Sequence, residues 1–415
     1  MPLLLAPPPS AARPLLAPTV PHLARTLLAG APETPPLLLA ILQASPPLLT
    51  PLLSHLLLSH SPPLPALSLF RRLLALPGFP VPEASLPALL RLLARSRRHA
   101  VLSFRLLDSL PPTHPHLLST PALAVLLSTA LSASAPGASF DAAVTCFDSA
   151  ARVWARAGRE FGVAELNALL RAFCARGRVA EARALFHRYC DAYPPDARTF
   201  NTLLLGFKEA GNAQALDLFY HDAVLRGFVP DAVSYCVRMD AYCKKGRFLD
   251  ALDLLDEMRK RENCRPTLQV FTTLIYGAGI RIGDLEGIWK VYSKMVGSGF
   301  MPRTRTTMLL MKVFCENARP DLGLELWDYL LGKGCVPHRH ALDVLVTGLC
   351  CRGVVLEAYR CFREMIEMGM TPTERAFRVL EGFLKRKREF EKLEEIRQMM
   401  KAAQLDEHQC DEEAA

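Results

Sequence analysis

The sequence predicts an all-α protein, specifically a right-handed solenoid of helix-turn-helix repeats about 35 residues long. Three features recur in phase from residue 163 onward: a proline that closes each unit, a glycine in its middle, and a small residue followed four positions later by a large apolar one. Three features in phase over six units are hard to obtain by chance, so the repeat decides the fold class. The closing prolines, 35 or 36 residues apart, are Pro195, Pro230, Pro266, Pro302, Pro337 and Pro372.

Each recurring residue has a physical role in a pair of helices. The glycine suits the left-handed conformation in which the first helix ends. The small residue lets the second helix approach its neighbours, and the large residue lies on the same face and fills the gap. The proline ends the second helix and directs the chain into the next unit. The glycine positions are Gly177, Gly211, Gly246, Gly283 and Gly353, with Ala318 in the remaining unit; the small residues are Ala182, Ala215, Ala251, Gly287, Gly323 and Ala358; the large ones are Phe186, Phe219, Leu255, Val291, Trp327 and Phe362.

Composition restricts the function classes. Half of the 415 residues are apolar, and abundant Leu and Ala with few aromatic residues favour helix over strand. The net charge of +8 permits an anionic partner such as nucleic acid without requiring one. The 12 cysteines form no C-x-x-C motif, which favours free thiols buried in a reducing compartment over zinc ligands or disulfides.

The first 33 residues are predicted to be an organelle transit peptide. They are rich in Pro, Leu and Ala, and their charged residues are two arginines, Arg13 and Arg25, and one acid, Glu33. An arginine-bearing amphipathic helical turn at 21–28 and the scarcity of serine favour the mitochondrion, with the chloroplast as the alternative. Low-complexity bias without a targeting role is the competing interpretation.

Residues 34–162 are predicted to be degenerate helical repeats. The stretch 34–70 lacks Asp, Glu, Lys and Arg, but prolines divide it into pieces of about ten residues or fewer. A membrane span needs about 20 apolar residues in a row, so we expect none here. The predicted helix pairs are 48–59 with 66–75, 83–94 with 99–110, and 121–131 with 140–157, the last pair joined by a turn at 133–139.

The repeats carry recognisable motifs. LNALL at 166–170 and FNTLL at 200–204 open two units, FCARGR at 173–178 and YCKKGR at 242–247 end first helices, and Pro-Asp closes two units. The Trp/Leu/Gly/Tyr signature of tetratricopeptide repeats is absent. The sequence therefore resembles the pentatricopeptide repeat family, in its P-class of plant organellar type. The six predicted units are 163–196, 197–231, 232–267, 268–303, 304–338 and 339–373.

The resemblance implies binding of single-stranded RNA, about one base per repeat, chosen by the fifth and last residues of the unit. Asn167 with Asp196, and Asn201 with Asp231, form the Asn/Asp pair that reads uracil in this family. An Asn amide offers one acceptor and two donors, which suits the uracil edge, and the Asp can hold the amide in place. The competing interpretations are exposed polar residues for the asparagines and helix N-caps for the aspartates.

The other units depart from the usual pairs: they carry Cys236/Thr267, Thr272/Arg303, Met308/His338 and Asp343/Thr373. Thr272 is kept as a candidate base-reading residue. At the second position, where the family has an aliphatic residue that sandwiches bases, the chain has Val233 once, and otherwise Ala164, Arg198, Gln269, Arg305 and His340. Lys244, Arg198, Arg303 and Arg305 are candidate phosphate contacts, with solvated surface as the alternative for the three arginines.

The end of the sequence is predicted to close the solenoid. Residues 374–401 are expected to form a charged helical capping unit, whose basic run at 385–388 is alternatively an RNA contact. Residues 402–415 are acidic and are expected to be disordered.

No catalytic site is predicted. The H-x-E and C-x-x-C motifs of a zinc deaminase are absent, about forty residues after Thr373 leave no room for a nuclease domain, and no phosphate-binding loop occurs. We expect no cofactor and no small-molecule substrate. The first hypothesis is an organellar RNA-binding adaptor that acts by occupancy, with ribosomal or RNA-processing proteins as further partners. The alternatives are a structural subunit of an organellar ribosome and a protein–protein scaffold.

Overall fold

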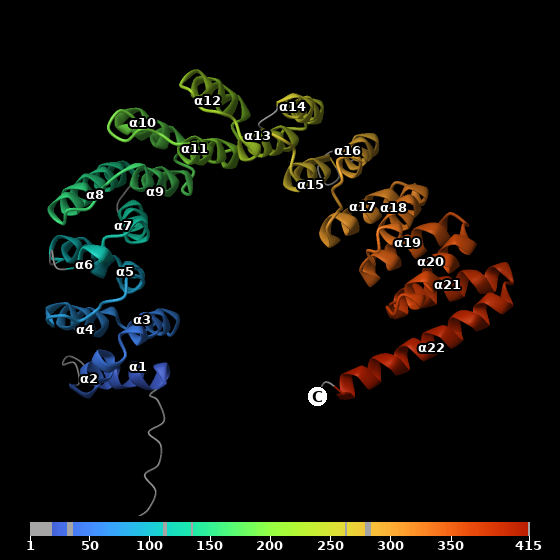
Figure 1. The fold of residues 1–415 in the computed structure, drawn as a ribbon, viewed down its shortest axis with the longest axis horizontal. Coiled ribbons are helices and arrows are strands. Elements are labelled where there is room, and N and C mark those ends of the chain that lie inside the picture. Colours follow the sequence, from blue (N-terminus) through green and yellow to red (C-terminus); the bar gives the residue numbers. More distant parts are fainter. Residues whose placement is uncertain are drawn as a thin grey trace, which may run out of the picture. The chain divides into compact units, whose positions relative to one another are not determined.

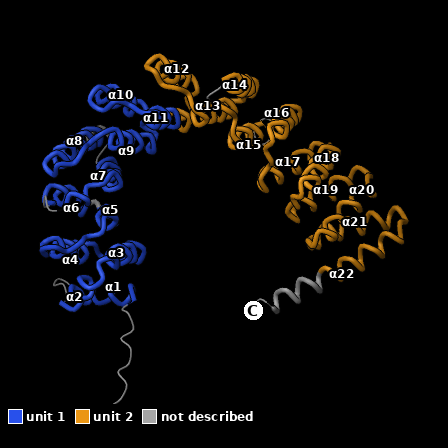
Figure 2. The backbone as a smooth tube through the Cα atoms, viewed as in Figure 1, with its two compact units in different colours: residues 1–206 blue, residues 207–415 orange. Residues whose placement is uncertain are grey.

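A computed structural model describes residues 19–30, 36–110, 114–133, 136–261, 264–278 and 284–413. Every regular element in these segments is a helix (Figure 1). The all-α solenoid prediction is therefore confirmed. The chain divides into two compact units, 1–206 and 207–415, and the division falls within helix α11, Ala197–Glu209 (Figure 2).

Unit 1 is a stack of helix pairs that begins at residue 20. Its odd-numbered helices are the first helices of their pairs; α3, α5, α7 and α9 follow one another in contact, and α7 and α9 also pack against their partners α8 and α10. The helices are α1 Val20–Ala29, α2 Pro36–Ala44, α3 Leu49–Leu58, α4 Pro63–Ala75, α5 Ser85–Ala94, α6 Arg97–Asp108, α7 Thr120–Ala133, α8 Pro136–Arg156, α9 Val163–Cys174 and α10 Val179–Tyr189, with short 3-10 helices at Pro46–Leu48 and Pro115–Leu117.

Unit 2 repeats the same arrangement. The first helices α13, α15, α17, α19 and α21 contact one another in order, and each packs against the second helix of its pair. The helices are α12 Ala213–Leu225, α13 Ala232–Lys244, α14 Phe248–Lys260, α15 Leu268–Tyr276, α16 Leu285–Gly297, α17 Thr304–Glu316, α18 Pro320–Gly332, α19 Arg339–Cys351, α20 Val355–Glu367, α21 Glu374–Lys387 and α22 Phe390–Glu413.

The recurring glycine has the conformation that the sequence predicts. Gly177, Gly211, Gly246 and Gly353 have φ between 68° and 81°, in the left-handed region that favours glycine. Ala318 stands in the same slot with φ 59°, so it adopts this conformation at a cost of about 1 kcal/mol relative to glycine. Gly283 lies outside the described residues.

The recurring large residue forms the core between helix pairs. Phe186, Leu255, Val291, Trp327 and Phe362 are fully buried, and Phe219 is nearly so. Burial of one such side chain contributes about 1.5–3 kcal/mol, so the stack gains most of its stability from contacts between neighbouring units. The small residues stand where helices come close: a Cβ on Gly287 would collide with the ring of Phe248.

Each closing proline directly precedes the residue at the N-terminal end of the next first helix, and three of these residues cap that helix through side-chain bonds to the backbone three residues on. Asp231 caps α13, Thr373 caps α21, and both accept a hydrogen bond from a backbone N–H three residues on. Asp196 accepts in the same way from Thr199 N at 2.7 Å, at the start of α11. In these three cases the last residue of a predicted unit therefore also caps the N-terminus of the next first helix.

The structure sets the boundaries of three predicted segments. The predicted turn at 133–139 is shorter, because α8 already begins at Pro136, and proline is favoured in the first turn of a helix. The predicted capping unit at 374–401 consists of two helices, α21 and α22, separated where Arg388 takes φ 58°. Helix α22, which contains neither Gly nor Pro, extends into the predicted disordered tail at 402–415 as far as Glu413.

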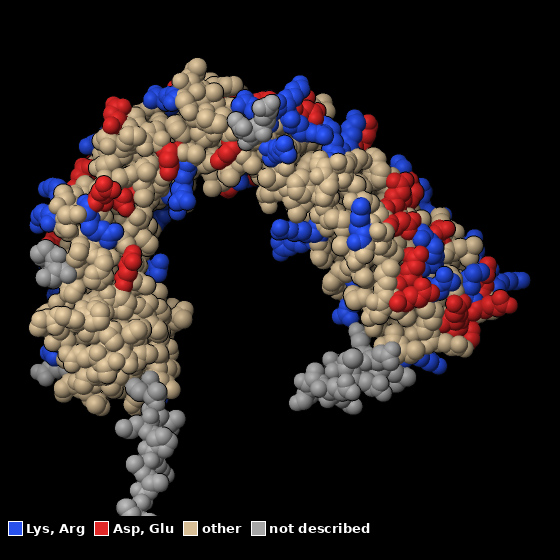
Figure 3. Space-filling view, viewed as in Figure 1, with Lys and Arg blue, Asp and Glu red and all other residues tan. Residues whose placement is uncertain are grey.

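The uncharged N-terminal part is folded as helices. Within the predicted transit peptide, Leu23 and Leu27 of α1 are buried, and α1 packs against α2, α3 and α4. The surface of α1–α4 shows few charged side chains (Figure 3). Among the described residues no single helix is long and apolar enough to cross a membrane; Pro36–Ala44 and Pro46–Leu58 pass by length and composition only as a pair bent by 115°.

The cysteines of the described segments are all free, and several fill close contacts between first helices. Cys174 packs against Gly206, Cys243 against Gly277, and Cys315 against Gly348. Burial raises the pKa of the Cys174 thiol to about 11 and that of Cys315, with a smaller contribution from Glu316, to about 12. These thiols therefore stay protonated at neutral pH and act as small packing residues.

Candidate functional site

The first helices of unit 1 form a groove, here called the unit 1 groove, of ≈ 910 Å³. It runs over α5, α7, α9 and the first turn of α11, and small residues such as Ala124, Ala168 and Ala172 form much of its surface. Its lining includes five arginines and no Asp or Glu. These are Arg91, Arg95, Arg171, Arg176 and Arg198.

The arginines of the unit 1 groove have few internal partners. Arg176 donates to the Ser128 carbonyl at 3.4 Å and to the Ser132 hydroxyl, and Arg95 contacts the Leu57 carbonyl at 3.5 Å and the His60 ring. The side chains of Arg91 and Arg171 make no hydrogen bond or ion pair with any residue that the structure describes. Among the five arginines, Arg198 interacts electrostatically with Asp196, whereas the contacts of Arg95 and Arg176 bring no negative charge into the groove. Most of the positive charge of the groove is therefore available to an anionic ligand.

Asn167 lies in the wall of the unit 1 groove, on α9. Its Nδ2 donates to Asp196 Oδ1 at 3.2 Å, and the side chain is 3% exposed. Its Oδ1 is buried and finds no donor among the described residues. The predicted fifth and last residues of this unit are thus in direct contact, and the amide keeps one unused acceptor.

Asp196 holds this arrangement as an ionised carboxylate. Besides Asn167, its Oδ1 accepts from the backbone and the hydroxyl of Thr199, at 2.7 and 2.8 Å. Desolvation by burial opposes ionisation, but the hydrogen bonds from Thr199 and Asn167 and the charge of Arg198 outweigh it and hold the pKa of Asp196 below its ordinary value. Asp196 is therefore both a helix cap and the anchor of Asn167.

The residues of the second Asn/Asp pair belong to different units, Asn201 to unit 1 and Asp231 to unit 2. Asn201 is half-buried on α11. Asp231 forms a capping box with Ser234 at the start of α13, with Ser234 N donating at 2.8 Å and Asp231 N donating to Ser234 Oγ at 2.9 Å. The N-cap interpretation holds for both aspartates.

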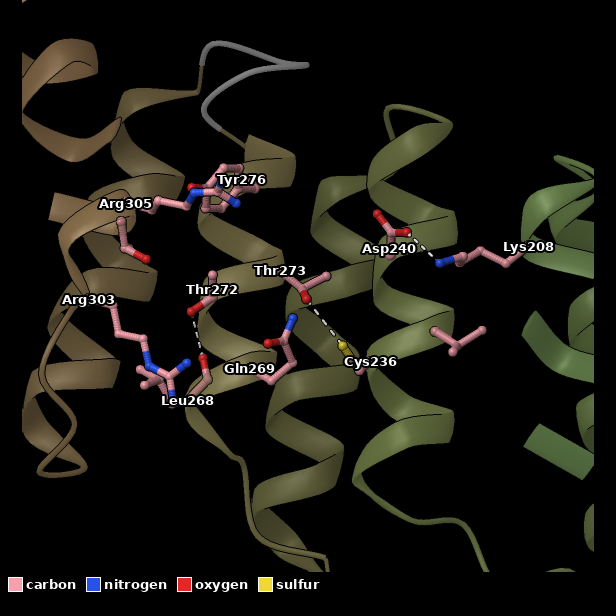
Figure 4. A pocket seen from close by; sticks show the side chains of 12 residues that line it. Lys208, Cys236, Asp240, Leu268, Gln269, Thr272, Thr273, Tyr276, Arg303 and Arg305 are labelled. Atoms are coloured by element: carbon pink, nitrogen blue, oxygen red, sulfur yellow. Dashed lines mark hydrogen bonds and ion pairs between the residues drawn. The ribbon is translucent and has the colours of Figure 1, made fainter. Parts of the chain in front are cut away.

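Unit 2 has a groove of its own, the unit 2 groove, of ≈ 570 Å³ over α13, α15 and the start of α17 (Figure 4). Three candidate residues line it: Thr272, Arg303 and Arg305. On one side Lys208 Nζ lies 3.2 Å from Asp240 Oδ2, so these two charges compensate each other. Arg303 and Arg305 lie on the segment entering α17 and are exposed.

Two candidate residues lie outside the lining of the unit 2 groove. Lys244 Nζ is 3.3 Å from Asp240 Oδ2 and 4.0 Å from Glu209 Oε1, so this predicted phosphate contact is engaged in an acidic cluster. Val233 is 54% exposed in the first turn of α13, where it offers an apolar surface to solvent.

Three of the four remaining fifth residues are hydrogen-bonded within the protein. The hydroxyl of Thr272 donates to the Leu268 carbonyl at 2.8 Å, and the thiol of Cys236 lies 3.1 Å from the hydroxyl of Thr273. Asp343, 8% exposed, accepts from its partner Thr373. The fifth and last residues of this unit are thus in contact, as Asn167 and Asp196 are, but here a hydroxyl rather than an amide donates to the carboxylate.

Sequence reasoning missed several lining residues. Arg171 and Tyr276 each follow a fifth residue by four positions and therefore share its helix face, a spacing that could have identified them. Arg91 and Arg95 lie in the degenerate region, where no repeat motif marks the groove face.

Comparisons with known proteins agree with this architecture. Residues 230–279 match the model of the PPR repeat family, and 166–190 and 342–370 match the PPR repeat. The small ribosomal subunit protein mL103 of Arabidopsis thaliana is 21% identical over 43% of this chain and 52% of its own length. The crystal structure of the pentatricopeptide repeat protein PPR10 from maize aligns with 92% of this chain and 56% of its own, with a TM-score of 0.51 and 22% identity, which shows a shared fold.

A further relative covers most of both chains. It is a pentatricopeptide repeat-containing protein of Arabidopsis thaliana, 32% identical over 85% of this chain and 84% of its own length. Together with the helix pairs, the left-handed turn between them and the family motifs, this likeness shows that the chain belongs to the pentatricopeptide repeat family.

Proposed function

We propose that this protein binds single-stranded RNA along its first helices and acts by occupancy, without catalysis. The observation that carries the proposal is the unit 1 groove, whose lining holds five arginines and no Asp or Glu, and whose wall contains Asn167 held by Asp196. Arginine matches phosphate geometry and stacks on bases, and an uncompensated basic groove is the electrostatic footprint of nucleic-acid binding.

Recognition is proposed to be weakly sequence-specific. Asn167 with Asp196, and Asn201 with Asp231, are assigned as uracil readers, as the family resemblance implies. The other four pairs lack this chemistry, and the Thr272 hydroxyl already donates a hydrogen bond to the Leu268 carbonyl of its own helix. Most of the affinity would therefore come from phosphate contacts by Arg198, Arg303 and Arg305 and by the arginines of the unit 1 groove, and uracil preference would be local. Lys244 and Val233, which lie outside the lining of the unit 2 groove, are proposed as additional RNA contacts.

The proposed site of action is an organelle, the mitochondrion rather than the chloroplast, because the N-terminal composition favours it. Bound RNA would be shielded from nucleases and kept unpaired, which serves RNA processing, stability or translation. The proposed leader is residues 1–33, on the basis of their composition.

The test is a titration of the full chain with short U-rich and A-rich single strands at two salt concentrations, with an RNA duplex as the control. We expect tighter binding to the U-rich strand and a linear fall of log K with log salt. Equal affinity for strand and duplex, or no binding at low salt, would refute the proposal.

A second candidate function is a structural role in an organellar ribosome. The four degenerate pairs and the resemblance to a small ribosomal subunit protein favour it. Co-sedimentation with ribosomal particles after nuclease treatment would support this alternative, whereas migration as a free protein would exclude it.

A further inference from the structure

We infer that Asp240 determines where RNA lies in unit 2, by keeping phosphates away from the α13 side of the unit 2 groove. Asp240 binds Lys208 and Lys244 and so acts as an internal substitute for a phosphate group. The backbone contacts of this unit then fall to Arg303 and Arg305, on the other side of the groove (Figure 4). This inference rests on the proposed RNA binding and assigns to Asp240 a role that opposes that binding on one face.

Asp240 belongs to a cluster of four charged side chains near the C-terminal ends of α11 and α13. Lys208 Nζ lies 3.0 Å from Glu209 Oε1 and 3.2 Å from Asp240 Oδ2. Lys244 Nζ lies 3.3 Å from Asp240 Oδ2 and 4.0 Å from Glu209 Oε1. Each lysine is therefore matched by both carboxylates, and the cluster as a whole is neutral.

The pair of Lys208 and Asp240 is partly withdrawn from water. The side chain of Lys208 is 15% exposed and that of Asp240 is 25% exposed, so solvent and salt screen their attraction less than that of a surface pair. Burial disfavours the charge of Lys208, but its hydrogen bonds to Glu209 and Asp240 outweigh burial and raise its pKa. Lys208 therefore keeps its proton at neutral pH, and its charge is already balanced when RNA arrives.

The unit 1 groove has no such carboxylate. Its described lining contains five arginines and no Asp or Glu, whereas the described lining of the unit 2 groove includes one acid, Asp240. Asp240 follows the fifth residue Cys236 by four positions, and Arg171 follows the fifth residue Asn167 by the same number. The two therefore occupy equivalent places on their helices, and this place of the repeat is positive in unit 1 and negative in unit 2.

A phosphate that approached Lys208 would have to displace a carboxylate. Phosphate and carboxylate compete for the same ammonium group, and the two anions repel each other at such distances. Lys244, proposed above as an additional RNA contact, meets phosphate only in the same competition. The side chains of Arg303 and Arg305 are exposed and make no hydrogen bond or ion pair with any described residue, so the phosphate path is favoured on their side.

The test is a gain of affinity in Asp240→Asn, measured in the full chain with a short U-rich single strand at several salt concentrations. Asn keeps the shape of the side chain and removes the charge, so each lysine that is released can take a phosphate. We expect binding to tighten by about three- to fivefold at 150 mM salt for each released lysine, and the slope of log K against log salt to steepen by about 0.7. The double variant Asp240→Asn with Lys208→Gln should lose most of this gain.

Asp250→Asn is the matched control, because it changes the net charge of the chain by the same amount. Asp250 lies in the first turn of α14, outside the groove lining, and binds Arg247 Nε at 2.7 Å. Its loss should leave the affinity unchanged. Glu209→Gln is a second variant, 59% exposed in the parent and therefore tolerant of substitution, and it should tighten binding in the same direction as Asp240→Asn. Melting temperatures show that each variant retains the fold.

The outcomes separate this inference from the proposed function. If the parent binds RNA and neither Asp240→Asn nor Glu209→Gln binds more tightly, the inference is refuted while the proposed function stands. An equal gain in Asp250→Asn would also refute it, since net charge alone would then explain the effect. If Asp240→Asn binds RNA and the parent does not, the inference stands and the proposed function is refuted. If neither protein binds RNA, both are refuted.

Discussion

Asn167 Nδ2 donates to Asp196 Oδ1 at 3.2 Å, and the same oxygen caps α11 by accepting from Thr199 N at 2.7 Å. One carboxylate therefore joins three elements: the first helix of one unit, the loop that closes it and the first helix of the next. A residue that orients the Asn167 amide is at the same time needed for the stability of the stack.

Asp196→Ala should lower the free energy of unfolding by about 1–2 kcal/mol, because it removes an N-cap. Asp196→Asn should lower the free energy of unfolding by only a few tenths of a kcal/mol, since Asn is an equally good cap. Urea denaturation of both variants measures the difference. Equal losses would mean that the carboxylate charge, rather than the cap, carries the stability.

The contribution of Asp196 should depend on pH in the acidic range. Its pKa is held below the ordinary value, chiefly by Thr199 and Asn167 against the opposing effect of burial, so the folded state favours the ionised form. The stabilisation is fully present above the unfolded pKa of about 3.9 and is lost as pH falls through the folded pKa. The difference in stability between the parent and Asp196→Asn, measured by thermal melts from pH 6 to pH 2.5, should shrink below about pH 4. A constant difference would contradict the assigned role.

Arg171→Gln should weaken RNA binding uniformly across sequences and reduce the magnitude of the slope of log K against log salt by about 0.7 for a single strand, because one phosphate contact is lost. Arg183→Gln is the matched control: Arg183 is exposed on α10, a second helix outside the groove lining. Titrations at 50 and 200 mM salt measure both slopes. Identical slopes for the two variants would remove Arg171 from the interface.

The sequence predicts the repeat and its turns well, because those depend on local conformation. Gly177, Gly246 and Gly353 have the left-handed conformation expected of their slot, and the large residues of each unit are buried. The helix pairs of 48–110 also lie close to their predicted ranges, since prolines mark their boundaries. These features follow from short-range rules that a sequence displays directly.

The sequence predicts the site less completely, because partners and neighbours come from different units. The contact of Asn167 with Asp196 follows from the family resemblance, but the salt bridges that engage Lys244 and the internal bond of Thr272 depend on side-chain geometry. The basic unit 1 groove draws Arg91 and Arg95 from helices without repeat motifs, so no spacing marks them.

Ala318→Gly should stabilise the protein by about 0.5–1 kcal/mol, because Ala318 has φ 59° in a slot where glycine avoids the steric penalty. The reverse change, Gly353→Ala, occupies the same slot in the next unit with φ 81° and should destabilise by about 1–2 kcal/mol. Melting temperatures of the two single variants and of their combination measure the effect. A destabilising Ala318→Gly would show that the extra flexibility of the unfolded chain outweighs relief of strain.

Gly277→Ala should destabilise unit 2 by about 1–3 kcal/mol, because the new Cβ would overlap the side chain of Cys243 and force α13 and α15 apart. Gly382→Ala is the control, since Gly382 lies inside α21, where an added methyl group would have no atom of another element within 4 Å, and this change should be neutral or stabilising by up to about 1 kcal/mol. The double variant Gly277→Ala with Cys243→Ala should recover part of the loss, because the smaller side chain makes room for the methyl group. Thermal melts of the parent, the two single variants and the double variant measure these changes in stability. If the double variant recovers none of the loss, close packing of Gly277 on Cys243 does not set the spacing of α13 and α15.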